Sequence, residues 1–273
     1  MLTHPRYNIA LIGCGKMGSA MLSAWVTHDL CQNIYVVDPH GLPAPLQKNL
    51  IIQSVDYSSL KDKHIDIIIL AVKPQAMASV CKSLGAVIPN GVVVLSIAAG
   101  QSLSSLENML SDDTPIIRAM PNTPAAIGKG VSVCISNNHI NDAQIEIASA
   151  LLEKNGIVEW VDDESLMDAV TALSGSGPAY IFHMIEVLAQ VGEDIGLKKE
   201  LAMILARQTV IGSAALAESE TTLPASKLRE NVTSPNGTTH AALKILMDGR
   251  IQDIYKEALL SARERSKELN SNN

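Results

Sequence analysis

Residues 7–18 of the chain read YNIALIGCGKMG. The apolar run Tyr7–Ile12 leads into a turn with glycines at Gly13, Gly15 and Gly18, and a helix-compatible stretch follows. In such a turn Gly13 permits the tight bend, Gly15 lets a ligand approach the backbone, and Gly18 lets helix and strand pack closely. The free N–H groups of the following helix face the same point and favour phosphate groups. The stretch therefore predicts a strand–turn–helix unit that binds a dinucleotide.

Asp38 lies at the end of the next apolar run, Asn33–Val37. An acid at this distance from the glycine turn can hold the adenosine ribose hydroxyls, and its charge repels a 2′-phosphate, which favours NADH. The loop Pro39–Pro45 offers no basic residue of the kind that an NADP site uses. The alternative interpretation is an ordinary Asp-Pro turn residue ahead of Pro39.

Apolar runs continue to alternate with helix-like segments up to residue 161. The expected strands are Tyr7–Ile12, Asn33–Val37, Asp66–Val72, Gly91–Ile97, Ile116–Met120, Val131–Ile135 and Gly156–Val161. The runs between Asp66 and Ile97 are continuously apolar, as in parallel strands covered by helices on both faces. The pattern predicts an α/β fold, with a doubly wound sheet of the Rossmann type forming a dinucleotide-binding domain over residues 1–161.

Residues 162–273 show helix patterns instead of strand patterns. Three long helices are expected, from Pro178 to about Gly196, from Lys198 to Glu218, and through Tyr255, Leu259 and Leu260. Helices this apolar bury more than one face, so we expect them to pack against a second copy of the chain. The second region is therefore predicted to be an all-α domain that carries both the substrate site and the dimerisation surface.

Composition limits the classes of function. The chain is 47% hydrophobic and 18% charged, which is typical of globular proteins. A net charge of -7 and an aromatic content of 3% argue against a nucleic-acid partner. Apolar runs fall short of the roughly 20 residues of a membrane span, and no signal peptide fits ahead of the first strand. Four cysteines without CxxC spacing indicate reduced thiols rather than a zinc site. We expect a soluble, cytoplasmic protein without a metal site.

Three later strand ends are expected to meet the same dinucleotide, because ligands of open α/β sheets lie beyond the carboxyl ends of strands. These ends are Ala71–Pro74, Ile97–Gly100 and Met120–Pro124, the last with two prolines near the expected nicotinamide. Lys73 could equally be a solvated surface lysine. The predicted dinucleotide site comprises Ile12, Gly13, Cys14, Gly15, Lys16, Met17, Asp38, Ala71, Val72, Lys73, Pro74, Ile97, Ala98, Ala99 and Asn122.

Two motifs of the second region suggest a ligand as well. Residues 231–239 read NVTSPNGTT, and Thr238 or Thr239 can cap the helix that follows while the loop amides point outward. Such a nest of N–H groups and hydroxyls suits a carboxylate, although a capped helix without a ligand is the alternative. Residues 174–178 read SGSGP, which indicates either close backbone approach or a plain connection between helices.

Taken together, the motifs resemble those of the pyrroline-5-carboxylate reductase family, over nearly the whole chain. The resemblance rests on IGCGKMGSAM at 12–21, AVKPQ at 71–75, SIAAG at 96–100, RAMPNTPA at 118–125, LSGSGPAYIF at 173–182 and LRENVTSPNGTTHAAL at 228–243. The family pattern has Gly-Gly before the two threonines, whereas this chain has Asn236-Gly237. Asn tolerates left-handed backbone angles, so the turn can persist.

The resemblance implies reduction of L-1-pyrroline-5-carboxylate to L-proline, the last step of proline biosynthesis, with NADPH or NADH. It also implies a helical domain that dimerises, with dimers assembled into larger rings. The implied substrate residues are Glu220, Asn231, Ser234, Gly237, Thr238 and Thr239. Thr239 would place its hydroxyl near the imine nitrogen as the catalytic residue, mainly to orient the imine. His183 and His240 are more often structural than acidic in such helices.

Two other functions fit parts of the pattern. A hydroxyacid dehydrogenase related to hydroxyisobutyrate dehydrogenase would need a lysine on a second-domain helix, but Lys198 and Lys199 open a helix and Lys227 precedes the Asn231 loop. A non-catalytic dinucleotide sensor would have no use for a carboxylate-binding nest. One assay distinguishes the three functions. The reductase oxidises NAD(P)H when the cyclic imine is added, the dehydrogenase reduces NAD(P)+ when a hydroxyacid is added, and the sensor does neither.

Overall fold

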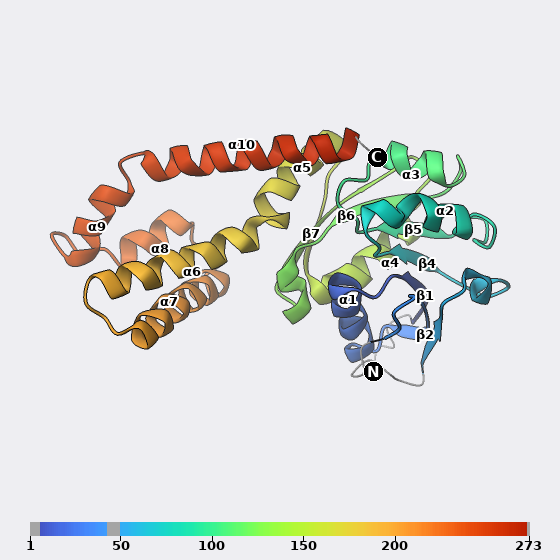
Figure 1. Ribbon diagram of the computed structural model, residues 1–273, viewed down its shortest axis with the longest axis horizontal. Coiled ribbons are helices and arrows are strands. Elements are labelled where there is room, and N and C mark those ends of the chain that lie inside the picture. Colours follow the sequence, from blue (N-terminus) through green and yellow to red (C-terminus); the bar gives the residue numbers. More distant parts are fainter. Residues whose placement is uncertain (1–5, 43–49, 272–273) are drawn as a thin grey trace. The chain divides into compact units, whose positions relative to one another are not determined.

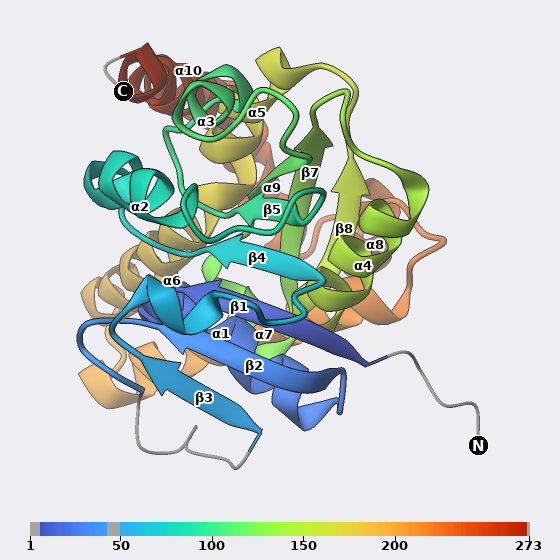
Figure 2. The ribbon, with the colours of Figure 1, turned by 90° about the vertical axis from the view of Figure 1, so that its right-hand side faces the viewer.

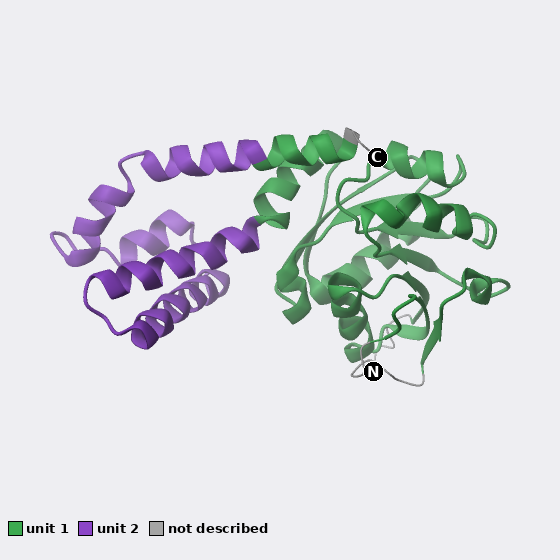
Figure 3. Ribbon diagram, in the orientation of Figure 1, with its two compact units in different colours: residues 1–176, 262–273 green, residues 177–261 purple. Residues whose placement is uncertain are grey.

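The computed structural model describes residues 6–42 and 50–271. Figures 1 and 3 show two compact units, which we call unit 1 and unit 2. Unit 1 comprises Met1–Ser176 together with Ala262–Asn273, and unit 2 comprises Gly177–Ser261. The boundary expected after residue 161 lies next to the end of the last strand. Unit 1 extends beyond that boundary to Ser176, and it also includes the segment that begins at Ala262.

Unit 1 is built on an eight-stranded sheet in the order β3-β2-β1-β4-β5-β6-β7-β8 (Figure 2). The strands are β1 (Tyr7–Ile12), β2 (Cys31–Val37), β3 (Ile51–Ser54), β4 (Ile67–Leu70), β5 (Val93–Ser96), β6 (Ile116–Met120), β7 (Gly130–Ser136) and β8 (Gly156–Trp160). Strands β1 to β6 form parallel neighbours in the order of a dinucleotide-binding Rossmann sheet. The predicted fold class is confirmed. The order of the strands changes direction between β1 and β4, and the glycine turn follows β1 at this point.

Two details of the sheet differ from expectation. The edge strand β3 was not expected, and β7 runs antiparallel to β6 although it is parallel to β8. The link from β6 to β7 contains only the short 3-10 turn Thr123–Ile127. A parallel return needs a dozen or more connecting residues, so this link forces the reversal.

Alternate residues of the central strands enter two hydrophobic layers on opposite faces of the sheet. Ile9 and Leu11 face the layer of α1 (Lys16–Thr27) and α4 (Asp142–Leu152). Ala10 and Ile12 face the layer of α2 (Met77–Leu84) and α3 (Leu103–Met109). The strands are buried on both faces, which explains why their sequences are continuously apolar.

All four cysteines, Cys14, Cys31, Cys81 and Cys134, are buried free thiols, as the sequence predicted. Burial raises the pKa of Cys31 and of Cys134 to about 12. Thiols with such pKa values stay protonated near neutral pH and pack as small apolar side chains.

Unit 2 is helical. It contains α6 (Gly177–Asp194), α7 (Lys199–Ser219), α8 (Ala225–Asn231), α9 (Thr238–Leu246) and the first part of α10 (Arg250–Ser271). The three long helices expected from the sequence are confirmed: α6 and α7 lie within two residues of the predicted bounds, and α10 contains Tyr255, Leu259 and Leu260. Small residues let α6 and α7 approach closely, since a Cβ on Gly192 would lie 3.1 Å from the Cβ of Ala202.

Most other apolar side chains of unit 2 are exposed in a single copy of the chain. Phe182 on α6 is 60% exposed and Ile211 on α7 is 51% exposed. Helix α7 is also long and apolar enough, by length and composition alone, to cross a membrane. A surface of this kind needs a partner that covers it.

Candidate functional site

The turn between β1 and α1 has the geometry of an anion-binding loop. Gly13 has φ +89°, and a Cβ there would lie 2.7 Å from the carbonyl oxygen of Ala71. Gly15 begins helix α1 without a side-chain cap among the described residues, and apart from Gly15 and its neighbours along the chain no described atom lies within 4 Å of where its Cβ would stand. The first amides of α1 therefore face open space beside an exposed Gly15, which is room for a pyrophosphate.

Asp38, at the end of β2, is bound to this turn. Its Oδ2 accepts a hydrogen bond from the N–H of Cys14 at 2.6 Å, and its Oδ1 accepts one from the N–H of His40 at 2.7 Å. The carboxylate is buried, with 7% of the residue exposed. Both interpretations of Asp38 fit this geometry, because each oxygen keeps a second lone pair for a ribose hydroxyl. Of the loop Pro39–Pro45, residues 43–45 lie outside the described part of the chain.

Cys14, inside the turn, is not a nucleophile. Burial, together with the nearby negative charge of Asp38, raises the pKa of its thiol to about 11. The residue contributes its backbone amide to the turn rather than its sulfur.

The other predicted strand ends lie at the same edge of the sheet, because β1, β4 and β5 are adjacent and parallel. Lys73 is exposed and precedes a short turn that begins at Pro74, while Ala71 and Val72 are half-buried. Ile97 and Ala98 are buried, and Ala99 is exposed. The structure thus brings the predicted dinucleotide residues to one edge.

Asn122, beyond β6, joins three segments of unit 1. Its Nδ2 donates to the carbonyl oxygen of Ser174 at 3.1 Å, and its Oδ1 accepts from the N–H of Val131 at 3.0 Å. Ser174 lies in a π-helical turn, Thr171–Gly175. An ordinary helix would satisfy that carbonyl with the N–H of residue 178, but Pro178 has none. Asn122 supplies the missing donor.

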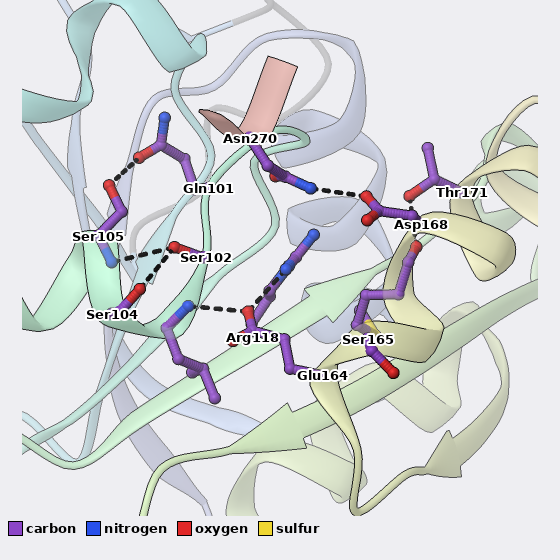
Figure 4. A network of polar contacts seen from close by, with 12 residues as sticks. Gln101, Ser102, Ser104, Ser105, Arg118, Glu164, Ser165, Asp168, Thr171 and Asn270 are labelled. Atoms are coloured by element: carbon purple, nitrogen blue, oxygen red, sulfur yellow. Dashed lines mark hydrogen bonds and ion pairs between the residues drawn. The ribbon is translucent and has the colours of Figure 1, made fainter. Parts of the chain in front are cut away.

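A partly buried ion pair, which was not predicted from the sequence, joins β6 to the segment after β8 (Figure 4). Arg118 on β6 is 4% exposed, and its Nη1 donates to Oε1 of Glu164 at 2.6 Å. The same oxygen accepts the N–H of Leu103 at the start of α3, at 2.8 Å. An arginine inside the apolar run Ile116–Met120 was the available signal, because a buried charge requires a partner.

A second set of polar contacts involves the last described turns of α10. Asp168 Oδ1 accepts hydrogen bonds from Ser266 Oγ at 2.7 Å and from Asn270 Nδ2 at 2.6 Å. These contacts attach the last turns of α10 to the short helix α5 (Met167–Val170) in unit 1.

The predicted substrate residues all belong to unit 2. Ser234, Gly237, Thr238 and Thr239 follow one another around the start of α9, Asn231 ends α8, and Glu220 lies just after α7. Each is exposed or half-buried. The first amides of α9 have no partner within the helix, so they are available to an anion.

One expectation about this loop is wrong. Neither Thr238 nor Thr239 caps the helix, because Gly237 is the capping residue and no described side chain accepts a hydrogen bond from the first-turn amides. The two threonines are instead the first helical residues. The turn ahead of them is closed by the N–H of Gly237, which donates to the carbonyl oxygen of Ser234 at 3.0 Å.

Among the residues that the structure describes, no group of three or more His, Cys, Asp or Glu side chains could hold a metal ion.

Two family models match the chain. One, for the dimerisation domain of pyrroline-5-carboxylate reductase, matches residues 164–269. The other, described as NADP oxidoreductase coenzyme F420-dependent, matches residues 8–100. The second match covers the glycine turn, Asp38 and the ends of β4 and β5.

Relatives match over nearly the whole length. A pyrroline-5-carboxylate reductase of Pseudomonas aeruginosa is 39% identical over 96% of both chains. One of Methanosarcina acetivorans is 38% identical over 96% of this chain and 97% of its own. The solved structure of the Coxiella burnetii enzyme superposes with a TM-score of 0.89 at 34% identity, covering 96% of this chain and 98% of that one. The Plasmodium falciparum enzyme, crystallised with NADP bound, gives 0.82 at 27% identity, covering 98% and 100%.

The Rossmann sheet, its glycine turn and these matches define an NAD(P)-dependent oxidoreductase with a helical dimerisation domain. Within that class, the chain belongs to the pyrroline-5-carboxylate reductase family.

Proposed function

We propose that this chain reduces L-1-pyrroline-5-carboxylate to L-proline with NADPH or NADH, as the last step of proline biosynthesis. The observation that carries the proposal is identity of 34–39% over 96% of the chain to relatives named for that activity. The reaction adds a hydride to C5 of the imine and a proton to its nitrogen, and the nicotinamide becomes oxidised.

The carboxyl edge of the sheet is the proposed cofactor site. Bound NAD(P)H would supply the hydride, and the open space beside Gly15 fits its pyrophosphate. In this proposal the amides of Gly13–Met17 hold the phosphates, Asp38 holds the ribose, and the segments 71–74 and 97–99 line the crevice. Asn122 fixes the backbone beyond β6, near the expected nicotinamide.

The proposed substrate site is the loop before α9. Ser234, Gly237 and Thr238 would hold the substrate carboxylate, because helix-start amides and hydroxyls favour an anion. Asn231 and Glu220 would complete the pocket. The chemistry then depends chiefly on position, since the reacting carbon must lie roughly 3–3.5 Å from the hydride donor.

Thr239 is the proposed catalytic residue. A protonated imine is already a good hydride acceptor, so a strong acid is unnecessary. The hydroxyl of Thr239 would orient the imine nitrogen by a hydrogen bond and support proton delivery as a weak acid.

We further propose that residues 1–161 bind the dinucleotide, and that residues 162–273 bind substrate and associate with a second copy. The exposed apolar side chains of α6 and α7 support a dimer or a larger ring of dimers. The same dimer accounts for the apolar character of α7 without a membrane. The net charge of -7 supports a protein that does not bind nucleic acid, and reduced cysteines support a cytoplasmic location.

The test is a steady-state assay of the purified chain, following oxidation of NADPH and of NADH. With pyrroline-5-carboxylate we expect turnover and L-proline as product, identified by chromatography. Activity only with a hydroxyacid and oxidised cofactor would support the dehydrogenase alternative instead. Binding of NAD(P)H without turnover of either substrate would support the sensor.

A further inference from the structure

The turn ahead of α9 has an asparagine, Asn236, at a position whose backbone angles favour glycine. In residues 234–237, which read SPNG, Asn236 has φ +60°. Pro235 in the second position, a positive φ in the third, and the closing hydrogen bond from Gly237 to Ser234 are the features of a type II turn. Asn tolerates this region better than most residues but at a higher cost than glycine, so a contact that stabilises Asn236 there strengthens the turn.

His240 provides that stabilisation. In a turn of this type the N–H of the third residue makes no hydrogen bond within the turn. Here the N–H of Asn236 donates to Nδ1 of His240 at 3.1 Å. His240 is the third residue of α9, and side chains at that position can reach back to the backbone just ahead of their own helix, as in a capping box.

This contact fixes the chemical form of the imidazole. Nδ1 can accept a hydrogen bond only when it carries no proton, so the contact requires the tautomer whose proton lies on Nε2. An imidazolium could not make the contact. His240 is therefore unsuited to act as a general acid while it holds the turn.

We infer that His240 is a positioning residue, which holds the Asn236 turn and thereby sets the backbone of Gly237, Thr238 and Thr239 that receives the substrate carboxylate. The inference rests on the proposed function for the identity of that ligand. It predicts an effect on affinity for the cyclic imine acid and little effect on the cofactor, whose proposed site is in unit 1.

Two substitutions separate the hydrogen bond from the size of the side chain. In His240→Asn the Oδ1 atom is attached to Cγ, as Nδ1 is, so it can accept the same hydrogen bond. In His240→Leu the side chain fills a similar space but has no acceptor, so the N–H of Asn236 loses its partner. Both variants are neutral and helix-compatible.

Steady-state kinetics of the full chain then give the decisive comparison. We expect His240→Leu to raise the KM for pyrroline-5-carboxylate about five-fold, equivalent to about 1 kcal/mol. The KM for NADPH and kcat should change by less than about two-fold, and His240→Asn should stay near the parent enzyme. An unchanged KM in the Leu variant, or equal impairment of both variants, overturns the inference.

A spectroscopic measurement keeps the inference separate from the proposed function. Long-range proton–nitrogen NMR of protein labelled in its histidines reports which ring nitrogen carries the proton, and the His240→Asn spectrum assigns the signal. We expect His240 to be protonated on Nε2 alone at mildly alkaline pH. A proton on Nδ1 overturns the inference even in an active enzyme. If the chain does not reduce the imine acid, the proposed function fails while this result still tests the contact.

Discussion

At the scale of single residues, Asp38 shows how one carboxylate can serve two purposes. It ties the end of β2 to the glycine turn through the N–H of Cys14, and it stabilises its own turn through the N–H of His40. Both contacts place negative charge where the ribose of the cofactor is expected.

Replacement of Asp38 by Asn tests its influence on cofactor choice. The amide can accept one of the two hydrogen bonds, but its NH2 group faces the other donor, which destabilises the turn by about 1–3 kcal/mol. We expect a higher KM for NADH and a higher ratio of kcat/KM for NADPH over NADH, because the charge that repels a 2′-phosphate is gone. The exposed Asp56, which accepts the N–H of Ser58 in a comparable turn, provides the control Asp56→Asn. If both cofactors are impaired equally, Asp38 is a turn residue only.

Thr239→Ala tests the proposed role of the hydroxyl. Loss of a residue that orients the imine and assists proton delivery should lower kcat by roughly ten- to a hundred-fold. Thr239→Ser keeps a hydroxyl and should retain most of the turnover. A fully active Ala variant would remove Thr239 from the mechanism.

At the scale of elements, the loop after β6 and the π-helical turn Thr171–Gly175 depend on each other. Met120 packs against Gly175, where a Cβ would lie 2.5 Å from Met120 Cε. The side chain of Asn122 donates a hydrogen bond to the carbonyl of Ser174, which cannot receive one from Pro178 because proline has no backbone N–H. The two segments therefore hold one another in place at the carboxyl edge of the sheet.

Asn122→Asp tests this dependence. The carboxylate can still accept the N–H of Val131, but it cannot donate to Ser174 and leaves that carbonyl unsatisfied, so we expect a loss of about 1–3 kcal/mol in the free energy of unfolding. Adding Pro178→Ala supplies a backbone N–H and should recover part of that loss, with Pro178→Ala alone as the control. Urea unfolding measures all three variants. An additive double variant would show that Pro178 and Asn122 are independent.

The elements also show what a sequence can predict. Strand β1 was predicted at its observed bounds and helix α6 within two residues, because their apolar spacing is regular and turn residues bound them. Strand β3, Ile51–Ser54, was missed because it is a four-residue edge strand that is half-exposed, so its apolar pattern is weak. The direction of β7 depends on the length of the link between β6 and β7. The periodicity of apolar residues predicts that a strand forms, but it does not predict the direction of that strand.

The residues of the candidate site also fall into those that the sequence could predict and those that it could not. The glycine turn and the loop before α9 are contiguous in sequence, and their motifs predicted where ligand-facing backbone would occur. The contacts of Asp38 with Cys14, Asn122 with Ser174, and Arg118 with Glu164 join segments far apart in the chain. Composition and spacing could indicate an unusual buried polar residue, but not its partner.

At the scale of the whole molecule, the exposed apolar side chains of unit 2 are the surface on which self-association depends. One hollow of about 480 Å³ between α6 and α7 is lined by the apolar side chains Phe182, Ile185, Met203 and Ile211, with Glu186 and Arg207 also in its lining. A charge placed there would lose its hydration in a dimer.

Phe182→Asp should therefore shift the chain toward monomer. We expect a smaller mass by light scattering during gel filtration, together with reduced activity. Val55→Asp, at a site in unit 1 that is 70% exposed, is the matched control and should leave the mass unchanged. An unchanged mass in the Phe182 variant would place the contact surface elsewhere on the chain.

Unit 2 is inserted into unit 1, since residues 262–271 of α10 belong to unit 1, where Ser266 and Asn270 bind Asp168. The order of these segments matters during synthesis. Asp168 leaves the ribosome 98 residues before Ser266 and 102 residues before Asn270. Because domains form as their residues emerge, unit 1 stays incomplete until α10 has been made, and a premature stop within that helix would damage both units at once.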